Sequence, residues 1–235
     1  MTDFTFTSIG IVRSPFREKF GIPRQPGLAP HAISQVVLLP DYASATCVEG
    51  LEAFSHLWLQ FVFHATADQG WHPTVRPPRL GGNERCGVFA TRSMFRPNPI
   101  GLSVVELVAI VDGEQGKELM VRGADLLDGT PVLDIKPYVP YADSIPVARA
   151  GFALAAPTLL PVMWSENAIA DAIQLEVSAD LHALIDEVLA QDPRPAYRAI
   201  QDDAHEYGVR LADVNVRFKV ENQRVCVIGV TRYVD

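Results

Sequence analysis

Short runs of hydrophobic residues, several of them alternating with polar ones, dominate the first 140 residues of this chain. The runs are rich in Val, Ile and Phe and are bounded by Pro, Gly or Asp, which is the pattern of β-strands separated by turns. Residues 49–54 are the one good candidate for a short helix in this region. The predicted strands are residues 4–14, 34–40, 55–65, 85–93, 100–113, 118–125 and 130–139.

Long amphipathic helices do not alternate with these strands, which argues against a parallel, doubly wound sheet. A closed barrel suits the pattern better, because closure removes exposed edge strands. We therefore predict a mainly β protein whose first domain, residues 5–145, is a single-sheet β-barrel.

The pattern changes after about residue 145. Residues 180–191 carry apolar side chains at helical spacing, which places them on one face of a helix. Two alternating runs, residues 214–220 and 224–234, flank a short polar turn and predict a β-hairpin. The sequence thus predicts a small α+β domain over residues 160–235, joined to the barrel by an Ala- and Pro-rich segment. The apolar residues of the helix are Leu181, Leu184, Ile185, Val188 and Leu189.

The composition is that of an ordinary globular protein, with 48% hydrophobic and 20% charged residues in a chain of 235. No stretch approaches the roughly 20 apolar residues of a membrane span, and the first residues lack the features of a secretory signal. We therefore expect a cytoplasmic protein with no membrane partner. Cys47, Cys86 and Cys226 lie far apart, so the sequence predicts neither a disulfide framework nor a metal site.

The formal net charge of −8 argues against a nucleic-acid partner, because polyanions are held mainly by neutralisation of their phosphates. The distribution of the charge changes this conclusion. Nine Lys or Arg face seven Asp or Glu in the first 100 residues, so this part is +2 and the rest of the chain is −10. A basic surface on the first part and a random spread of solubility charge both fit, and both interpretations stay open.

Several common chemistries are not supported by the spacing of residues. A dinucleotide-binding glycine loop, a P-loop and a nucleophile elbow are all missing from the sequence. His56 and His64 share one predicted strand, but eight residues at about 3.3 Å each put them roughly 26 Å apart, too far to share a metal. Ser14, Ser93 and Ser103 are interpreted as strand or turn residues that bond locally.

Two loops hold arginines between prolines. Residues 95–101 read FRPNPIG and residues 21–27 read GIPRQPG. Proline fixes its own φ and pushes the preceding residue into an extended conformation, so both loops are stiff. A planar guanidinium can hold an oxyanion through two parallel hydrogen bonds, and a stiff loop keeps it in position before binding. Arg24 and Arg96 are therefore candidates for binding an anionic ligand.

A third candidate is the turn ADLLDGTPVLDIKPY, residues 124–138. Asp128 and Gly129 suit a tight hairpin turn, which gives Asp128 a structural as well as a functional interpretation. The charged residues Asp125, Asp134 and Lys136 fit either a solvated edge strand or the lining of a polar pocket.

These motifs together resemble one family. The segments GVFATRSMFRPNP, SPFREKFGIPRQPG, GLEAFSHLW, VRPPRLGG and DGTPVLDIKPY are similar to those of the TrmO family, also called TsaA-like or VirR proteins. The resemblance runs over about residues 5–145 through several motifs in order. A segment like QDPRPAY, residues 191–197, is found in the C-terminal extension of the closer bacterial members.

The resemblance implies a tRNA methyltransferase that uses S-adenosylmethionine and methylates N6 of threonylcarbamoyladenosine at position 37, beside the anticodon. It also implies a single-sheet β-barrel and a homodimer with cofactor sites near the subunit interface. The absence of a glycine-rich loop is then expected. The family's cofactor contacts map to Arg24, Gln25, Pro26, Phe63, His64, Arg92, Leu102, Asp125, Leu126, Leu127 and Asp128.

Roles for the remaining candidates follow from this implied chemistry. The acceptor nitrogen is a poor nucleophile, so a nearby carboxylate or phenol would help to remove its proton, and Asp134 and Tyr138 are the candidates. Phe63 would either orient the sulfonium or pack in the core. The residues expected to bind the anticodon loop are Arg96, Arg194, Tyr197 and Arg198.

Other interpretations remain. The segment DPRP, residues 192–195, also fits the simple end of a helix. For the whole chain, the alternatives are a non-catalytic module that binds S-adenosylmethionine or RNA, and a methyltransferase that acts on a small metabolite.

Overall fold

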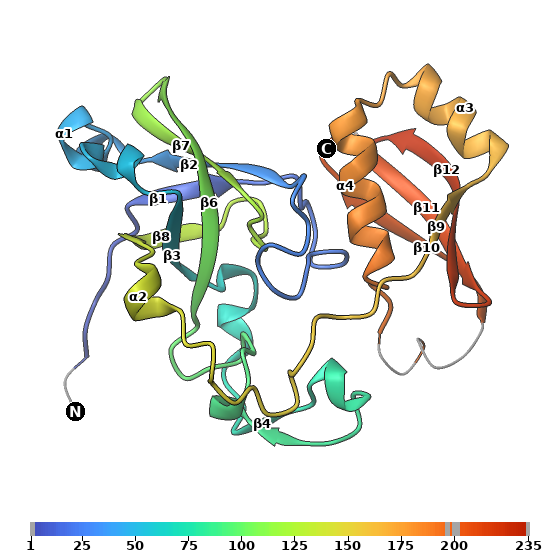
Figure 1. Cartoon of the computed structure of the whole chain (residues 1–235), viewed down its shortest axis with the longest axis horizontal. Helices are drawn as coiled ribbons and strands as arrows, with labels where there is room; N and C mark the ends of the chain where they lie inside the picture. Colours follow the sequence, from blue (N-terminus) through green and yellow to red (C-terminus); the bar gives the residue numbers. More distant parts are fainter. Residues whose placement is uncertain (1–2, 196–197, 199–202, 234–235) are drawn as a thin grey trace.

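The computed structural model describes residues 3–195, 198 and 203–233. Two lobes lie side by side: the first part of the chain forms a β-barrel, and the last part forms a sheet with helices (Figure 1). The prediction of a mainly β fold is confirmed. Residues 144–161 connect the lobes and run along the bottom of the view in Figure 1 before they reach β9.

Six strands form the barrel, and every paired neighbour is antiparallel. The sheet closes where β1 pairs with β8 through Gly10 and Val132. Alternate residues of each strand point inward, so the interior is filled by side chains such as Val36, Leu59 and Leu119. In the order of the sheet the strands are β1 (Gly10–Arg13), β2 (Ile33–Leu38), β7 (Gly116–Arg122), β6 (Ile100–Gly113), β3 (His56–Val62) and β8 (Pro131–Pro137).

Short elements fill the connections of the barrel. The prediction of a full strand over residues 85–93 is wrong, because only β5 (Cys86–Gly87) pairs, with β4 (Thr74–Val75), and the chain then turns into a 3₁₀ helix. The helix expected over residues 49–54 is a single 3₁₀ turn, preceded by α1 (Ala45–Val48). Helix α2 (Pro140–Asp143) follows β8. The 3₁₀ turns are η1 (Pro40–Tyr42), η2 (Leu51–Ala53), η3 (His64–Gln69), η4 (Pro78–Leu80) and η5 (Val88–Ala90).

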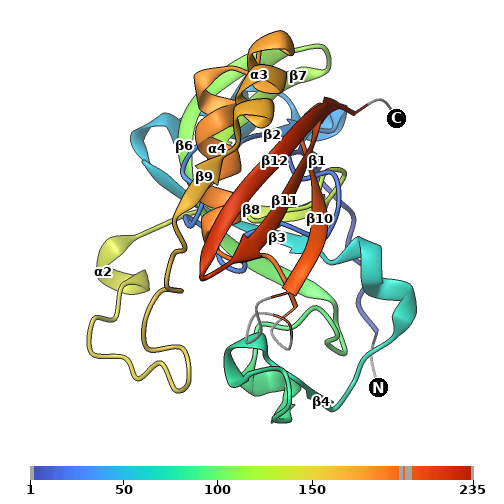
Figure 2. The same ribbon diagram turned by 90° about the vertical axis from the view of Figure 1, so that its right-hand side faces the viewer.

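The C-terminal lobe is a four-stranded sheet in the order β10 (Asp203–Leu211), β11 (Val214–Glu221), β12 (Arg224–Arg232) and β9 (Val162–Trp164). The predicted hairpin is β11 and β12, whereas β9 pairs in parallel with β12. Helices α3 (Glu166–Gln174) and α4 (Ala179–Ala190) each begin at a serine whose side chain accepts a hydrogen bond from the first turn. Helix α4, predicted from its periodicity, lies on the side of the sheet that faces the barrel (Figures 1 and 2).

Residues 14–32, between β1 and β2, leave the barrel and pack into the C-terminal lobe. We call them the interdomain segment. Phe16 and Ala29 belong to the hydrophobic core of the C-terminal lobe and are each 1% exposed. Phe16 pairs with Leu211 in an isolated β-bridge, and the ring of Phe20 stacks near that of Phe218. The hydrophobic core of the C-terminal lobe therefore includes residues from near the start of the chain.

Two glycines of this segment allow a test of how closely it packs. Both have left-handed φ, +87° at Gly21 and +77° at Gly27. A Cβ at Gly21 would lie 2.4 Å from Cγ2 of the buried Val209, whereas a Cβ at Gly27 would have no atom within 4 Å. Gly27→Ala should lower the free energy of unfolding by about 1 kcal/mol through backbone strain alone.

Gly21→Ala adds a clash with a fully buried side chain, so it should lower the free energy of unfolding by roughly 1–3 kcal/mol more than Gly27→Ala. Urea unfolding of both variants measures the difference. Equal losses would show that the interdomain segment can move away from β10 without a penalty.

Candidate functional site

Three segments far apart in the sequence meet beside the barrel. The Pro23–Pro26 loop is held to the end of β7 by a hydrogen bond from the Gly27 amide to the Gly123 carbonyl, 2.8 Å long. Nη1 of Arg92 donates a 2.6 Å hydrogen bond to Oε1 of Gln25. The structure thus brings together Gln25, Arg92 and Asp125, which the sequence had placed on separate motifs.

Asp125 is the carboxylate of this cluster. Its Oδ1 accepts a 2.6 Å hydrogen bond from the hydroxyl of Ser103, which is itself 2% exposed. Burial raises the pKa of Asp125 from its ordinary value of 3.8 to about 6, although the Ser103 bond and the positive charge of Arg92 oppose that rise. The carboxylate is therefore ionised at neutral pH at the expense of stability, which is typical of functional sites.

The chemistry of the cluster suits a ligand that carries both signs of charge. The exposed guanidinium of Arg92 can bind a carboxylate, and Gln25 keeps it in place. The carboxylate of Asp125 can stabilise a positive charge a short way off. A cluster of this kind fits a zwitterionic small molecule better than a purely anionic one.

Phe63 and His64 lie where β3 ends. The Phe63 amide donates a 2.8 Å hydrogen bond to the Pro99 carbonyl, so this segment holds the FRPNPIG loop in place. The Phe63 ring meets Phe61 edge-on at 5.2 Å and packs against the barrel core, in line with the packing role that the sequence left open. His64 begins η3.

The remaining residues of the cofactor prediction differ in orientation. Leu126 is 2% exposed in the barrel core, and the Leu127 carbonyl accepts the bonds of the tight turn from Thr130. Asp128 holds the interdomain segment, because it accepts hydrogen bonds from the Ser14 amide at 2.8 Å and from Arg17 at 2.6 Å. Leu102, which is 51% exposed, is adjacent in sequence to the buried Ser103 and faces away from it.

Arg96 braces its own loop. Its Nη1 donates to the carbonyls of Thr91, at 2.8 Å, and Val88, at 3.3 Å, and its guanidinium lies 5.8 Å from the centre of the Phe89 ring. These contacts favour a structural role for its guanidinium. The proposed contact between Arg96 and the substrate therefore stays a prediction that would require the side chain to exchange partners.

Arg24 turns away from Gln25 toward the end of α4. Its Nη2 lies 3.4 Å from the Arg194 carbonyl. The side chain of Arg194 is 4% exposed and holds Asp192 through two hydrogen bonds, at 2.8 and 2.9 Å. This burial favours a structural role for Arg194, and its contact with substrate stays a prediction. Arg198 is half-buried, and Tyr197 lies outside the described residues.

The two candidates for proton removal lie on and after β8. Oδ2 of Asp134 accepts a 2.5 Å hydrogen bond from Lys136, and the Asp134 side chain is 45% exposed. Tyr138 packs against the ring of Trp58, with centres 5.8 Å apart. Asp134 is paired with Gln60 of β3, and Gln60 is paired with Leu102 of β6, so these three residues lie in one row across the sheet.

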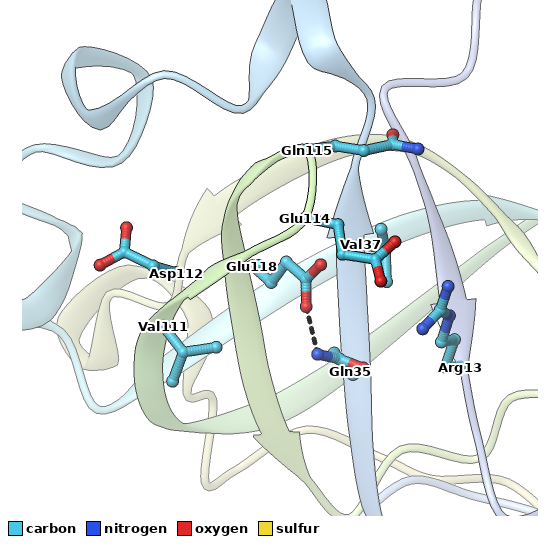
Figure 3. Close-up of a pocket in the computed structure, with 9 residues that line it drawn as sticks. Arg13, Gln35, Val37, Val111, Asp112, Glu114, Gln115 and Glu118 are labelled. Carbon is cyan, nitrogen blue, oxygen red and sulfur yellow. Dashed lines mark hydrogen bonds between the residues drawn. The ribbon is translucent and has the colours of Figure 1, made fainter.

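The sequence interpretation missed two features. The sequence predicts that Ser103 is a strand or turn residue that bonds locally; it does lie on β6, but the alternation of that strand places it on the inner face, where it bonds to the distant Asp125. The second feature is a polar pocket of about 230 Å³ on the outer face of the barrel (Figure 3). There the buried Glu118 accepts a hydrogen bond from Gln35, with Arg13 close by. Glu118 points outward from its strand, and nothing in the sequence indicates that neighbouring residues bury it.

In the part of the chain that the structure describes, no three His, Cys, Asp or Glu side chains gather in a way that could hold a metal ion. Within the same residues, every helix is too short or too polar to cross a bilayer.

The fold and the cluster together define a class: an antiparallel β-barrel joined to an α+β lobe, with a cluster of charged and polar side chains beside the barrel. The sequence model described as "tRNA-methyltransferase O N-terminal domain" matches residues 11–144, and the one described as "TrmO C-terminal domain" matches residues 157–233. The chain belongs to the TrmO family, as the resemblance of its motifs had indicated.

Individual relatives agree with this assignment. The tRNA (adenine(37)-N6)-methyltransferase of Escherichia coli is 52% identical over 94% of each chain. A probable S-adenosyl-L-methionine-binding protein of Pyrococcus abyssi is 41% identical over 63% of this chain and 74% of its own. The crystal structure of TrmO from Pseudomonas aeruginosa superposes with a TM-score of 0.80, at 42% identity, over 98% of this chain and 99% of its own.

Proposed function

We propose that this protein is an S-adenosylmethionine-dependent tRNA methyltransferase that methylates N6 of adenine 37, and that its substrate is threonylcarbamoyladenosine. Family membership over both lobes supports the activity. The structural observation that carries it is the meeting of Gln25, Arg92, Asp125 and Ser103, because this cluster matches the charges of the cofactor's amino-acid end.

The cofactor would supply an activated methyl group on a positively charged sulfur. Arg92 would bind its carboxylate, with the guanidinium oriented by Gln25. Asp125, fixed by Ser103, would stabilise its positive charge. Because the Pro23–Pro26 loop is stiff and bonded to Gly123, these groups would be in position before binding.

We assign proton removal from the acceptor nitrogen to Asp134, on β8, or to Tyr138, the residue that follows β8. Asp134 is accessible and Tyr138 is half-buried, so either could meet a base that is presented to the outer face of the barrel. Lys136 donates a hydrogen bond to Oδ2 of Asp134, which orients its carboxylate.

A homodimer is part of the same proposal. Strand β6 exposes a row of side chains on its outer face in which Ile100 is 37%, Leu102 51% and Val108 44% exposed, with the ion pair of Glu106 and Arg122 between Leu102 and Val108. A two-fold contact through this row would cover it. Within one chain Leu102 points outward, away from the cluster of Arg92 and Asp125. In the dimer it would lie beside a cofactor.

A cofactor-binding test of Arg92 separates this site from others. Arg92→Ala should weaken binding of S-adenosylmethionine by about 10- to 100-fold, since a hydrogen bond to a charged group contributes roughly 1.5–3 kcal/mol. Arg92→Lys should recover part of the affinity, because it restores the charge without the planar fork. Isothermal titration calorimetry measures both, with Arg76→Ala as a control that removes another exposed arginine. Unchanged affinity in Arg92→Ala would place the cofactor elsewhere.

The activity itself is tested by mass spectrometry of tRNA nucleosides. Wild-type protein with cofactor should convert threonylcarbamoyladenosine in tRNA to its N6-methyl form. A non-catalytic module would bind the cofactor and give no methylated nucleoside. A methyltransferase of a small metabolite would leave the tRNA nucleosides unchanged and methylate another acceptor.

A further inference from the structure

A pocket of about 150 Å³ lies where the interdomain segment, the η4 loop and the end of α4 meet. Its walls are mainly apolar and include Ile22, Leu28, Pro157 and Val188. Two arginines also line it, Arg24 from the Pro23–Pro26 loop and Arg79 from η4. Both are exposed, so the pocket is open to a ligand from solvent.

The charges around this pocket are not balanced. Although Arg24 as a whole is exposed, partial burial of its guanidinium lowers its pKa; the charge of Asp192 opposes this shift, and the like charge of Arg79 lowers the pKa further. Asp192 already accepts two hydrogen bonds from the side chain of Arg194. The guanidinium groups of Arg24 and Arg79 thus line one cavity. The carboxylate of Asp192, which favours the charged form of Arg24, is also bonded to Arg194. An anion would relieve this repulsion.

Arg24 and Gln25 are adjacent in sequence, but their side chains lie on different sides of the Pro23–Pro26 loop. Gln25 bonds to Arg92 on the side of Asp125, whereas Arg24 lines the pocket on the side of α4. The side chain of Arg24 is therefore separated from the cluster that suits the cofactor, although the family resemblance assigns both residues to it.

We propose that this pocket is a phosphate subsite for the tRNA substrate. A phosphodiester would lie between Arg24 and Arg79, and its nucleoside would pack against the apolar wall of Ile22, Leu28 and Val188. This inference rests on the proposed function, because it takes tRNA as the substrate. It adds a role for Arg79, and it moves the guanidinium of Arg24 from the cofactor to the substrate.

The distribution of charge supports a nucleic acid as the ligand. A chain of net charge −8 can bind a polyanion only where its cations gather, and this pocket gathers two of the nine in the first 100 residues. The pocket also includes Pro157 and Val188 from the last third of the chain. One phosphate bound there would contact both lobes and fix the substrate relative to the cofactor loop.

Arg79→Gln is the variant for testing the subsite. Arg79 donates one 2.5 Å hydrogen bond, to the carbonyl of Ala155 in the exposed connecting segment, so its replacement should not unfold the protein. The matched control is Arg13→Gln, an exposed arginine of β1 that lines the other pocket. Fluorescence anisotropy of labelled tRNA at several salt concentrations gives the affinity and its salt dependence for each variant.

Arg79→Gln should weaken tRNA binding by about 3- to 10-fold at low salt and reduce the slope of log K against log salt by about one, as expected for the loss of one phosphate contact. Arg79→Lys should keep the slope of the wild type. Cofactor affinity should stay within twofold, and in methyl transfer KM for tRNA should rise while kcat is kept. Arg13→Gln should match the wild type throughout.

Three results would overturn the subsite. The first is an unchanged salt slope in Arg79→Gln. The second is a loss of cofactor affinity as large as the loss of tRNA affinity, which would assign the pocket to the cofactor carboxylate. The third is binding of adenosine monophosphate that Arg79→Gln abolishes without any change for tRNA, which would indicate a free nucleotide. Because wild-type methyl transfer to tRNA is measured separately, a failed subsite is distinguishable from a failed proposed function.

Discussion

Replacing Asp125 with asparagine should make the ligand-free protein more stable at neutral pH and at the same time weaken its binding of S-adenosylmethionine. The gain in stability arises because burial disfavours the charged carboxylate, which raises its pKa to about 6. The difference from the ordinary value of 3.8 corresponds to roughly 3 kcal/mol at 1.36 kcal/mol per pH unit, as an upper bound. Asparagine carries no charge and still offers an oxygen to the Ser103 hydroxyl.

The pH dependence follows from the same shift. A carboxyl group with a raised pKa binds more protons in the folded than in the unfolded state between about pH 4 and 6, so wild-type stability falls as the pH rises through that window. Above pH 6 the full penalty is present. The stability gained by Asp125→Asn should therefore be near zero below pH 4 and reach its maximum above pH 6. Urea unfolding at several pH values measures it.

Cofactor binding should change in the opposite direction. Loss of the carboxylate should reduce affinity by about tenfold or more at pH 7.5, since one charge interaction with the sulfonium or ammonium is removed. Wild-type affinity should fall below pH 6 as Asp125 takes up a proton, whereas the variant should be insensitive to pH in this range. Asp41→Asn, at an exposed acid, is the control. A variant that is less stable yet binds normally would show that Asp125 has only a structural role.

The second large effect is expected at Phe16. Phe16→Ala should lower the free energy of unfolding by about 3–5 kcal/mol, the usual result of truncating a fully buried aromatic side chain. Phe16 is 1% exposed within the core of the C-terminal lobe, while its carbonyl accepts a 2.9 Å hydrogen bond from Asp128 at the end of the barrel. One residue thus joins the two lobes.

The loss should reach the cofactor loop as well as the core. Residues on both sides of the Pro23–Pro26 loop are anchored in the C-terminal lobe, by Phe16 and Phe20 before it and by Ala29 after it. Loosening one anchor should weaken cofactor binding, although Phe16 does not belong to the proposed site. Urea unfolding, hydrogen exchange of each lobe and calorimetry of cofactor binding measure these effects.

Phe6→Ala is the matched control, because Phe6 is 67% exposed and its truncation should change the free energy of unfolding by less than about 0.5 kcal/mol. If Phe16→Ala increased hydrogen exchange in the C-terminal lobe alone and left cofactor affinity unchanged, the lobes would be independent. The cofactor loop would then be held by the barrel only.

An arginine beside prolines in the sequence does not by itself indicate which partner its side chain contacts. All three candidates, Arg24, Arg92 and Arg96, lie on or near proline-bound loops. Only Arg92 joins the cluster with Asp125, whereas Arg96 bonds to its own loop and Arg24 faces the other lobe. Proline fixes the backbone, but the partner of a guanidinium five bonds away depends on what the fold brings near it.

The sequence by itself determined the local elements. Alternation of apolar and polar residues gave the strands of the barrel and the hairpin of β11 and β12, and helical spacing gave α4. These patterns are local because each residue's face is set by its neighbours within a turn or two. The motifs also indicated the family, because several of them occur in the same order as in its members.

The tertiary structure alone decided the rest. The short β9 has too few residues to show a period, and its parallel partner β12 lies about 60 residues later in the chain. The placement of Phe16 in the core of the other lobe, the bond from Ser103 to Asp125, and the divergence of Arg24 from Gln25 all depend on contacts between distant segments. Such contacts arise from packing of whole elements, which leaves no periodic trace in either segment.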